Sequence, residues 1–216
     1  MAARGPIHRR RRRPKQRRAI ATVDAVLDAV IRVLKREGFS ALTTNRIAEV
    51  AGVSIGSVYQ YFADKSAIFA ALHQRHIEAI DRLIASTLVE RAASPLEELI
   101  TALVKTMVDA HTADPELFVL LSTEVPHRSG SAQDFATRLH GVFRLALSSR
   151  MTELERRGDL DRVVFVVANM VESLSHAAAL QRPLGVSLAE AKSEAVKAVL
   201  AYLHEVASHS HAWGSV

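Results

Sequence analysis

The chain has 216 residues, of which 49% are hydrophobic, and it contains no cysteine. That length allows one or two domains with a substantial core, and the lack of cysteine excludes a disulfide scaffold and a cysteine-ligated zinc site. No apolar run reaches ~18 residues, and no apolar signal region lies near the first residue, so we expect no membrane span and a cytoplasmic protein.

The first 18 residues carry nine Lys and Arg side chains and no acidic one, so the rest of the chain is net acidic. A like-charged block with so few apolar residues cannot bury a core, and we expect residues 1–18 to be disordered when alone. Such an arm can lie along DNA phosphates or in the minor groove, whereas a solvated tail has the same composition. A DNA-binding domain directly after the arm would favour DNA contact.

The first helix is predicted between Gln16 and Gly38. Its apolar residues recur at helical spacing and are Ile20, Val23, Leu27, Val30, Ile31 and Leu34. Gly38 is expected to end this helix, and Phe39 to fill the core that the helix shares with the segment that follows.

The segment from Thr43 to Lys65 (TTNRIAEVAGVSIGSVYQYFADK) predicts two short helices joined by a tight turn, with a further helix starting after them. Thr43 and Ser54 can cap the two helices, and Gly52 can adopt the positive φ that a sharp turn requires. The side chains expected to face inward are Ile47, Ala48, Ala51, Val58 and Phe62. This is the helix-turn-helix pattern, in which the second helix enters the DNA major groove.

The outer face of the second helix is expected to carry Ile55, Ser57, Tyr59, Gln60 and Tyr61. Hydroxyls and amides bond phosphates and base edges, which is a reason to expose them on one short helix. Packing is the alternative role for one of the two tyrosines. Ile55 is expected to touch a thymine methyl group or nothing.

The run from Leu42 to Leu72 resembles the DNA-binding domain of TetR-family transcriptional regulators. It matches nearly every fixed position of the signature T-[IV]-x-x-I-A-x-x-A-G-V-S-x-G-[ST]-[LVI]-Y-x-[HY]-F-x-x-K-x-x-[LI]. Asn45 and Arg46 stand where many members have a different polar pair, which affects only sequence preference. The likeness is sharp from about Ala19 to Arg75 and architectural beyond.

The resemblance implies an all-α protein of about nine helices. Residues 1–18 would form the basic arm, residues 19–75 a three-helix helix-turn-helix domain, and residues 76–216 a helical effector-binding and dimerisation domain. Lys65 matches the family lysine that contacts a backbone phosphate. The full set of residues predicted to contact DNA is Thr43, Thr44, Asn45, Arg46, Ser54, Ile55, Gly56, Ser57, Tyr59, Gln60, Tyr61 and Lys65.

After the helix-turn-helix, the apolar spacing predicts helices and no strand. A long helix capped by Asp64 is expected to link the two domains. The later helices are expected at Pro95–His111, Pro115–Leu121, Phe135–Arg157, Asp161–Leu180 and Ser187–Ala207, with Ser94 and Asp159 as caps and a loop at Val125–Ser131.

The helix Asp161–Leu180 is apolar nearly all round, so we expect it to be buried on more than one side. In the family the last two helices pack against their two-fold mates, which implies a homodimer surface at Val163–Leu180 and Ser187–Leu203. A monomeric core closed by both helices is the alternative. A two-fold dimer implies a palindromic double-stranded DNA operator.

The family resemblance also implies a pocket for an unknown small-molecule effector among the middle helices of the C-terminal domain. Few aromatic residues and few buried charges favour an apolar or weakly polar effector. The candidate lining residues are Met107, His111, Phe118, Leu121, Phe143 and Met170. Core packing would explain each of them equally well.

Two other site types are not expected. Gly52 to Gly56 fits the G-x-S-x-G nucleophile elbow, but a short helix rather than a strand precedes the serine, and no histidine and acid complete a triad. The ten histidines accompany neither cysteine nor an H-E-x-x-H motif. Those that crowd together are His73 and His76 on one helix, and His204, His209 and His211 near the C-terminus. We expect no catalytic residue, no metal and no cofactor.

These observations predict a homodimeric DNA-binding transcriptional regulator, most simply a repressor that an effector releases from a palindromic operator. The alternative is an architectural DNA-binding protein that relies on the arm of residues 1–18 and has no effector.

Overall fold

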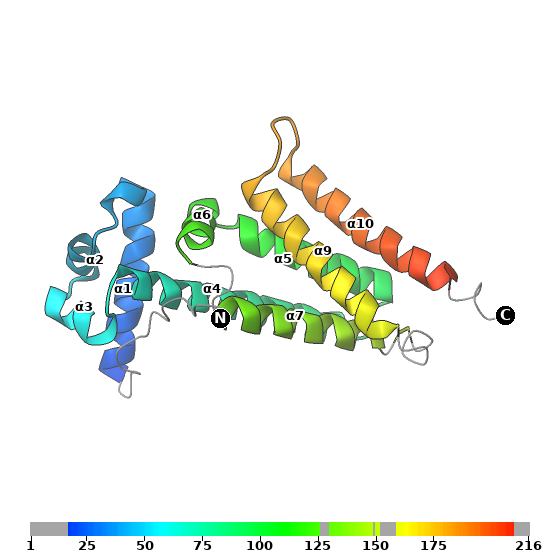
Figure 1. Ribbon diagram of the computed structural model, residues 1–216, viewed down its shortest axis with the longest axis horizontal. Coiled ribbons are helices and arrows are strands. Elements are labelled where there is room, and N and C mark those ends of the chain that lie inside the picture. The colour runs from blue at the N-terminus through cyan, green and yellow to red at the C-terminus, as the bar shows by residue number, and fades with distance from the viewer. Residues whose placement is uncertain (1–16, 126–129, 149, 152–158, 210–216) are drawn as a thin grey trace, which may run out of the picture. The chain divides into compact units, whose positions relative to one another are not determined.

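The computed structural model describes residues 17–125, 130–148, 150–151 and 159–209 (Figure 1). Within these ranges the chain forms nine α-helices and one short 3-10 helix, and no β-strand. The all-α prediction is therefore confirmed. The described residues divide into two compact units. The first unit comprises the described part of residues 1–77 together with residues from 116–131, and the second comprises 78–115 with the described part of 132–216.

The first unit is built from short helices around one apolar core. Its elements are α1 (Arg17–Glu37), the 3-10 helix η1 (Phe39–Ala41), α2 (Thr44–Ala51), α3 (Ile55–Tyr61), the first part of α4 (Lys65–Glu90), and α6 (Pro115–Glu124). Helix α1 ends before Gly38, whose φ of 80° lies in the region that favours glycine. Helix α1 packs against α2, α3 and η1.

The core of the first unit follows the predicted periodicity, with two corrections. Val23, Leu27 and Val30 are buried on α1, as are Ile47 on α2 and Val58 on α3. The first correction is Ile20 on α1, which belongs to the predicted apolar face but is 49% exposed. The second is Phe39, which was predicted to fill this core but is 48% exposed. Leu42, which directly follows η1, is 2% exposed and takes a core position instead. The single turn of η1 rotates the chain between these two residues.

Helix α6 belongs to the core of the first unit, which the sequence does not reveal. Leu117, Leu120, Leu121 and Val125 join the same buried cluster as the helix-turn-helix residues. Apolar spacing identifies which face of a helix is buried, but not which neighbour covers it. The predicted C-terminal domain of residues 76–216 includes α6, whereas the structure groups residues 116–131 with residues 1–77.

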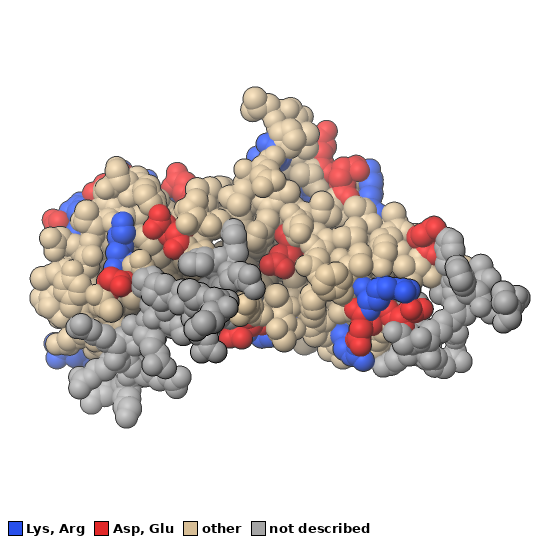
Figure 2. Space-filling view, viewed as in Figure 1, with Lys and Arg blue, Asp and Glu red and all other residues tan. Residues whose placement is uncertain are grey.

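The second unit contains the remainder of α4 with α5 (Leu96–Thr112), α7 (Gly130–Ser148), α9 (Leu160–Leu180) and α10 (Leu188–His209). Helices α5, α9 and α10 pack against one another. Ion pairs tie helices that are distant in the sequence: Arg138 to Asp81, Arg144 to Asp161, and Lys192 to Asp109. His204 Nε2 also lies within hydrogen-bond distance of Glu97 Oε1, at 2.7 Å. In Figure 2 blue and red side chains of this unit lie next to one another, as paired charges do.

Several predicted helix ends of the second unit differ from the structure. Helix α5 starts after Pro95 with no side-chain cap, so Ser94 is not its cap. Asp159 is at the N-cap position of α9, but its carboxylate pairs with Arg162 instead of bonding a backbone amide. The Asp159 backbone is helical (φ −85°, ψ −14°) rather than extended, so it lacks the conformation from which an N-cap side chain reaches a backbone amide.

Three further boundaries also moved. Helix α6 continues to Glu124 rather than ending at Leu121, and α7 spans Gly130–Ser148 rather than Phe135–Arg157. The amides of Arg150 and Met151 both bond the Leu147 carbonyl, which closes the end of α7. Residues 126–129 of the expected loop and Gly158 lie outside the described residues, as does the arm up to residue 16.

Among the described residues, α9 is the one helix that is long and apolar enough, by length and composition alone, to cross a membrane. One face of it is buried in the second unit, including Val163, Val167 and Val171. Such a partly buried core helix passes the same test, so the observation is weak evidence for a membrane span. Phe165 and Leu180 remain 58% and 39% exposed, so the single chain does not cover α9 on every side.

Candidate nucleic-acid interface

Side-chain caps fix the start of both helices of the helix-turn-helix. The Thr43 hydroxyl accepts a hydrogen bond from the Arg46 amide at 3.1 Å, and the Ser54 hydroxyl accepts one from the Ser57 amide at 3.1 Å. Both capping residues have extended backbone, as an N-cap requires. These hydrogen bonds confirm both predicted caps. Thr43 and Ser54 are also exposed, so each helix starts at the surface.

The turn between α2 and α3 depends on Gly52. Its φ of 70° and ψ of 30° are left-handed, and its amide bonds the carbonyls of Ala48 and Glu49. A glycine in this conformation ends a helix without the steric cost that a side chain would add. Ala48 on α2 is buried in the core of the first unit, and α2 packs against α3. The two helices are therefore held at a defined angle by local backbone geometry.

Helix α3 exposes most of the side chains predicted to meet DNA. Ile55 and Tyr59 are 37% and 42% exposed, and Gln60 is also exposed. Ser57 is half-buried and its hydroxyl lies 2.8 Å from that of Ser54. Tyr61 is half-buried and packs against the core of the first unit. Of the two tyrosines, Tyr61 thus has a packing role, and Tyr59 is the one that projects furthest into solvent.

The fold does not require glycine at position 56. Its φ is not among the positive values, and among the described residues the nearest atom that an added Cβ would meet, beyond its chain neighbours, is the Ser54 Oγ at 3.9 Å. A glycine within a helix costs roughly 0.5–1 kcal/mol relative to alanine. A glycine that the fold does not require, exposed on the first turn of α3, allows close approach of another molecule to the backbone.

Lys65 lies at the start of α4 beside two aromatic rings. Its Nζ lies 5.8 Å from the centroid of the Phe39 ring and 5.5 Å from that of Phe69. A cation over an aromatic face is attracted by the ring quadrupole. The Asp64 carboxylate accepts a hydrogen bond from the Ala67 amide at 2.8 Å, which confirms the predicted cap of this helix. The exposed Phe39 thus has a partner that the sequence analysis missed.

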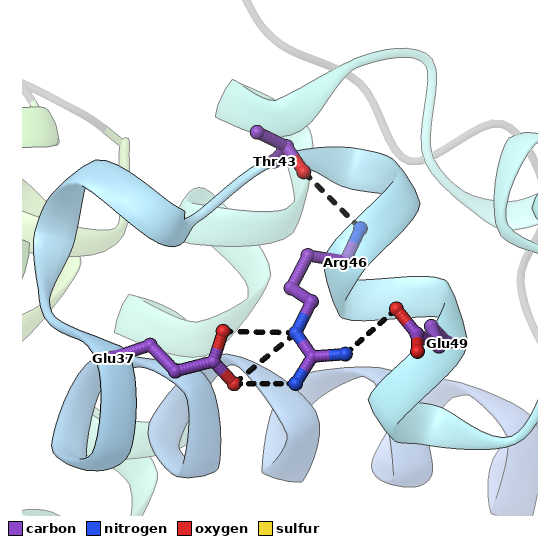
Figure 3. Close-up of polar contacts among 4 residues, drawn as sticks. All are labelled: Glu37, Thr43, Arg46 and Glu49. Atoms are coloured by element: carbon purple, nitrogen blue, oxygen red, sulfur yellow. Dashed lines mark hydrogen bonds and ion pairs between the residues drawn. The ribbon is translucent and has the colours of Figure 1, made fainter.

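Arg46 differs from the other residues predicted to meet DNA because its guanidinium is already engaged within the protein. It pairs with Glu37 at the end of α1 and with Glu49 on α2 (Figure 3). Thr43, Asn45 and the other polar residues of this segment lie at the surface beside it, with Thr44 half-buried. Nothing in the sequence signals the pair with Glu37, since the two residues lie nine positions apart across a turn.

The six residues predicted to line an effector pocket do not lie in a single unit. Met107 and His111 on α5, Phe143 on α7 and Met170 on α9 belong to the second unit. Leu121 is part of the core of the first unit, and the Phe118 ring lies 6.4 Å from that of His76 in the same unit. The four residues of the second unit remain candidates for lining one effector pocket.

A polar group is buried among those four candidates. His111 is 3% exposed, its Nδ1 lies 2.8 Å from the Met107 carbonyl oxygen, and its ring lies 4.9 Å from that of His176 on α9. Ser175, next to His176, is fully buried. Among the described residues, no three His, Cys, Asp or Glu side chains are placed to hold a metal ion.

Comparison with known families matches both halves of the chain. Residues 26–72 match the family described as bacterial regulatory proteins, tetR family. Residues 95–203, about half of the chain, match the tetracyclin repressor-like C-terminal domain.

Individual relatives share less of the sequence. The nucleoid occlusion factor SlmA of Haemophilus ducreyi is 45% identical over 51 residues, which is 23% of this chain and 25% of SlmA. The chain therefore spans only about a quarter of the length of that curated relative.

Solved structures share the architecture of nearly the whole chain. A transcriptional regulator from Streptomyces coelicolor is 26% identical with a TM-score of 0.66, covering 87% of this chain and 98% of its own. The Thermus thermophilus FadR repressor, solved in complex with lauroyl-CoA, is 19% identical with a TM-score of 0.58, covering 82% of this chain and 93% of its own.

Proposed function

Because the chain belongs to the TetR family of bacterial transcriptional regulators, we propose that it is a homodimeric repressor that an effector releases from a palindromic DNA operator. The observation that carries this proposal is α3. Two capped helices and a left-handed glycine hold Tyr59 and Gln60 on the exposed side of a short helix that can enter a major groove.

The proposed contacts fall into two classes. Tyr59, Lys65 and the exposed threonine Thr43 would bond phosphates, which sets affinity and register without reading sequence. Gln60 would read a base edge, since an amide pairs with adenine through two hydrogen bonds. Ser57 would support α3 through its hydroxyl contact with Ser54 and contribute a weaker base contact.

The proposed dimer uses the surfaces of α9 and α10 that the single chain leaves open. Phe165 and Leu180 are exposed on α9, and Ala198 and Ala201 are exposed on α10. Large apolar groups on one helix and small ones on the other allow helices of a second copy to pack closely. A two-fold pair would present two α3 helices to successive major grooves of one DNA face.

The proposed effector site lies in the second unit, near the buried His111 on α5 and the half-buried His176 on α9. The FadR of Thermus thermophilus binds lauroyl-CoA within the same fold, which supports a long apolar group as one class of effector. An effector that favours one spacing of the two α3 helices would shift operator affinity, and the operator would shift effector affinity equally. The protein would act in the cytoplasm, where the DNA lies.

The alternative function is architectural DNA binding through the basic arm, without an effector. The similarity to SlmA, named a nucleoid occlusion factor, is the observation that favours it, but it extends over only 51 residues. Architectural binding would show weak sequence preference and would depend on residues 1–18.

The test is selection of DNA from a random pool, with the full chain and with residues 1–18 removed. The repressor proposal expects the same palindromic motif from both proteins, since α3 carries the readout. Failure to enrich a motif, or affinity that vanishes with the arm, would contradict the repressor and support architectural binding. Ligands can then be screened by their release of the selected operator.

A further inference from the structure

The guanidinium of Arg46 joins two helices of the first unit. Its Nε donates to Glu37 Oε2 at 2.9 Å, and its Nη2 donates to Glu37 Oε1 at 2.7 Å. Glu37 is the last residue of α1, and Arg46 is in the first turn of α2. The pair is a two-pronged arginine–carboxylate contact, the geometry in which charge-assisted hydrogen bonds are strongest.

A second carboxylate occupies the remaining side of the same guanidinium. Arg46 Nη1 lies 2.7 Å from Glu49 Oε2 (Figure 3). Glu49 is one turn further along α2, so this contact stays within one helix. The Glu49 side chain is 69% exposed, whereas that of Glu37 is 31% exposed. Only the Glu37 contact therefore links α2 to another element.

We infer that Arg46 does not bind DNA but positions α2 against α1, with Glu37 as its partner. The inference rests on the proposed DNA-binding function, and it removes Arg46 from the predicted set of DNA contacts. All three guanidinium nitrogens are already engaged by carboxylates. A phosphate would have to displace one of these carboxylates, and the other would remain nearby to repel it.

The Arg46–Glu37 contact lies where it can control the orientation of α3. Between Glu37 and α2 the chain passes through the left-handed Gly38 and the single turn of η1. The backbone amide of Arg46 also donates a hydrogen bond to the Thr43 hydroxyl. Arg46, whose side chain contacts α1, is therefore fixed within the first turn of α2. Helix α2 packs directly on α3, so a rotation of α2 about its start would displace Tyr59 and Gln60.

Electrostatics alone predicts the opposite effect of losing Glu37. Removing a carboxylate near a DNA-binding surface lowers repulsion of phosphates, so it should tighten binding. If Arg46 were a phosphate ligand, freeing it from Glu37 should tighten binding further. A loss of affinity on neutralising Glu37 is expected only if the contact holds the helices in place. The sign of the change is therefore the discriminating measurement.

The experiment compares Glu37→Gln with Glu49→Gln in the full chain. Both remove one carboxylate from the same guanidinium, but only the first breaks the link between helices. On the operator selected with the wild-type protein, we expect Glu37→Gln to weaken binding by about 3- to 10-fold, and Glu49→Gln to leave it unchanged or tighter. Circular dichroism at the assay temperature would establish that each variant is folded.

Two further readouts separate positioning from DNA contact. Arg46→Gln should match Glu37→Gln, and the double variant should bind no more weakly than either. The salt dependence of Arg46→Gln should stay parallel to that of the wild type, because a lost phosphate contact would lower the slope by about one per site. Tighter binding by Glu37→Gln, or a lowered salt slope for Arg46→Gln, would overturn the inference.

Amide hydrogen exchange in the free protein tests the link without DNA. Glu37→Gln should speed exchange in α2 and α3, and Glu49→Gln should not. Equal exchange in both variants would overturn the inference. If the wild-type chain selects no operator, the proposed function fails, yet this exchange measurement still decides whether Arg46 positions α2.

Discussion

The two units of this protein differ in how the starts of their helices are fixed. In the first unit, Thr43, Gly52 and Ser54 fix the ends of α2 and α3 through contacts with their own backbone neighbours. In the second unit, α5 and α9 begin without a side-chain cap. Ion pairs between helices occur in both units, for example Arg138–Asp81 in the second and Arg75–Asp28 in the first. Helix α10 is the exception to the uncapped starts, since the Ser187 hydroxyl and the Glu190 carboxylate cap each other's amides.

This difference matches what each unit is proposed to do. A surface that reads DNA needs side chains held within a fraction of an ångström, and local caps and turns provide that precision. A unit that binds an effector and a second copy is defined by packed faces, which tolerate many sequences of similar volume. A short signature thus identifies the first unit, whereas the second unit is defined mainly by its apolar periodicity.

The largest expected effect comes from breaking the proposed dimer through the second unit. Phe165→Glu places a charge on the exposed side of α9, and a monomer would keep only half of the DNA contacts. We expect operator affinity to fall by at least about 100-fold. Sedimentation of the free protein should show a monomer. Leu145→Glu, an equally exposed change on α7, is the control and should leave a dimer.

The next effect concerns sequence readout by the first unit. Gln60→Ala should remove about 1–3 kcal/mol of discrimination at one base pair of each half-site and leave the others unchanged. Repeating the DNA selection with the variant would show this as one relaxed position. A motif identical to that of the wild type would mean that Gln60 reads no base.

A smaller effect is expected at the lysine beside two aromatic rings. Lys65→Ala should weaken binding to all DNA sequences alike and lower the salt slope by about one per site. Phe39→Leu keeps an apolar side chain but removes the ring near the ammonium group, so it should weaken binding by a few-fold without changing the slope. Titrations at several salt concentrations would separate the two changes.

Gly56 provides a test in which stability and binding move in opposite directions. Alanine fits the helical backbone there without a clash, so Gly56→Ala should raise the free energy of unfolding by about 0.4–1 kcal/mol. If DNA approaches the backbone of α3, the same change should weaken operator binding. Unchanged affinity in the more stable variant would show that no close approach occurs at this position.

The smallest expected effect is the pH dependence of the link between α1 and α2. Hydrogen bonds from Arg46 hold the pKa of Glu37 below its ordinary value of 4.5. A carboxyl whose pKa is lower in the folded state stabilises that state above pH 4.5 and loses this contribution as the pH falls through the folded value. Wild type should therefore melt about 1–3 °C above Glu37→Gln at pH 7, with the gap closing in acid.

The sequence by itself determined the helical class, the caps of α2, α3 and α4, the left-handed turn at Gly52 and the outward direction of α3. Each of these depends on residues within four positions of one another, so local chemistry is enough to predict it. The same reasoning failed at Ser94, where Pro95 takes the N-cap position, and at Asp159, whose backbone is helical and whose carboxylate pairs with Arg162.

Tertiary structure alone decided the partners of residues far apart in the chain. It placed α6 in the core of the first unit and so separated Leu121 and Phe118 from the other proposed pocket residues. It turned Phe39 toward solvent near Lys65, and it paired Arg46 with Glu37. Periodicity and composition say which side chains are buried or charged, but the partner of each is fixed only when the helices pack.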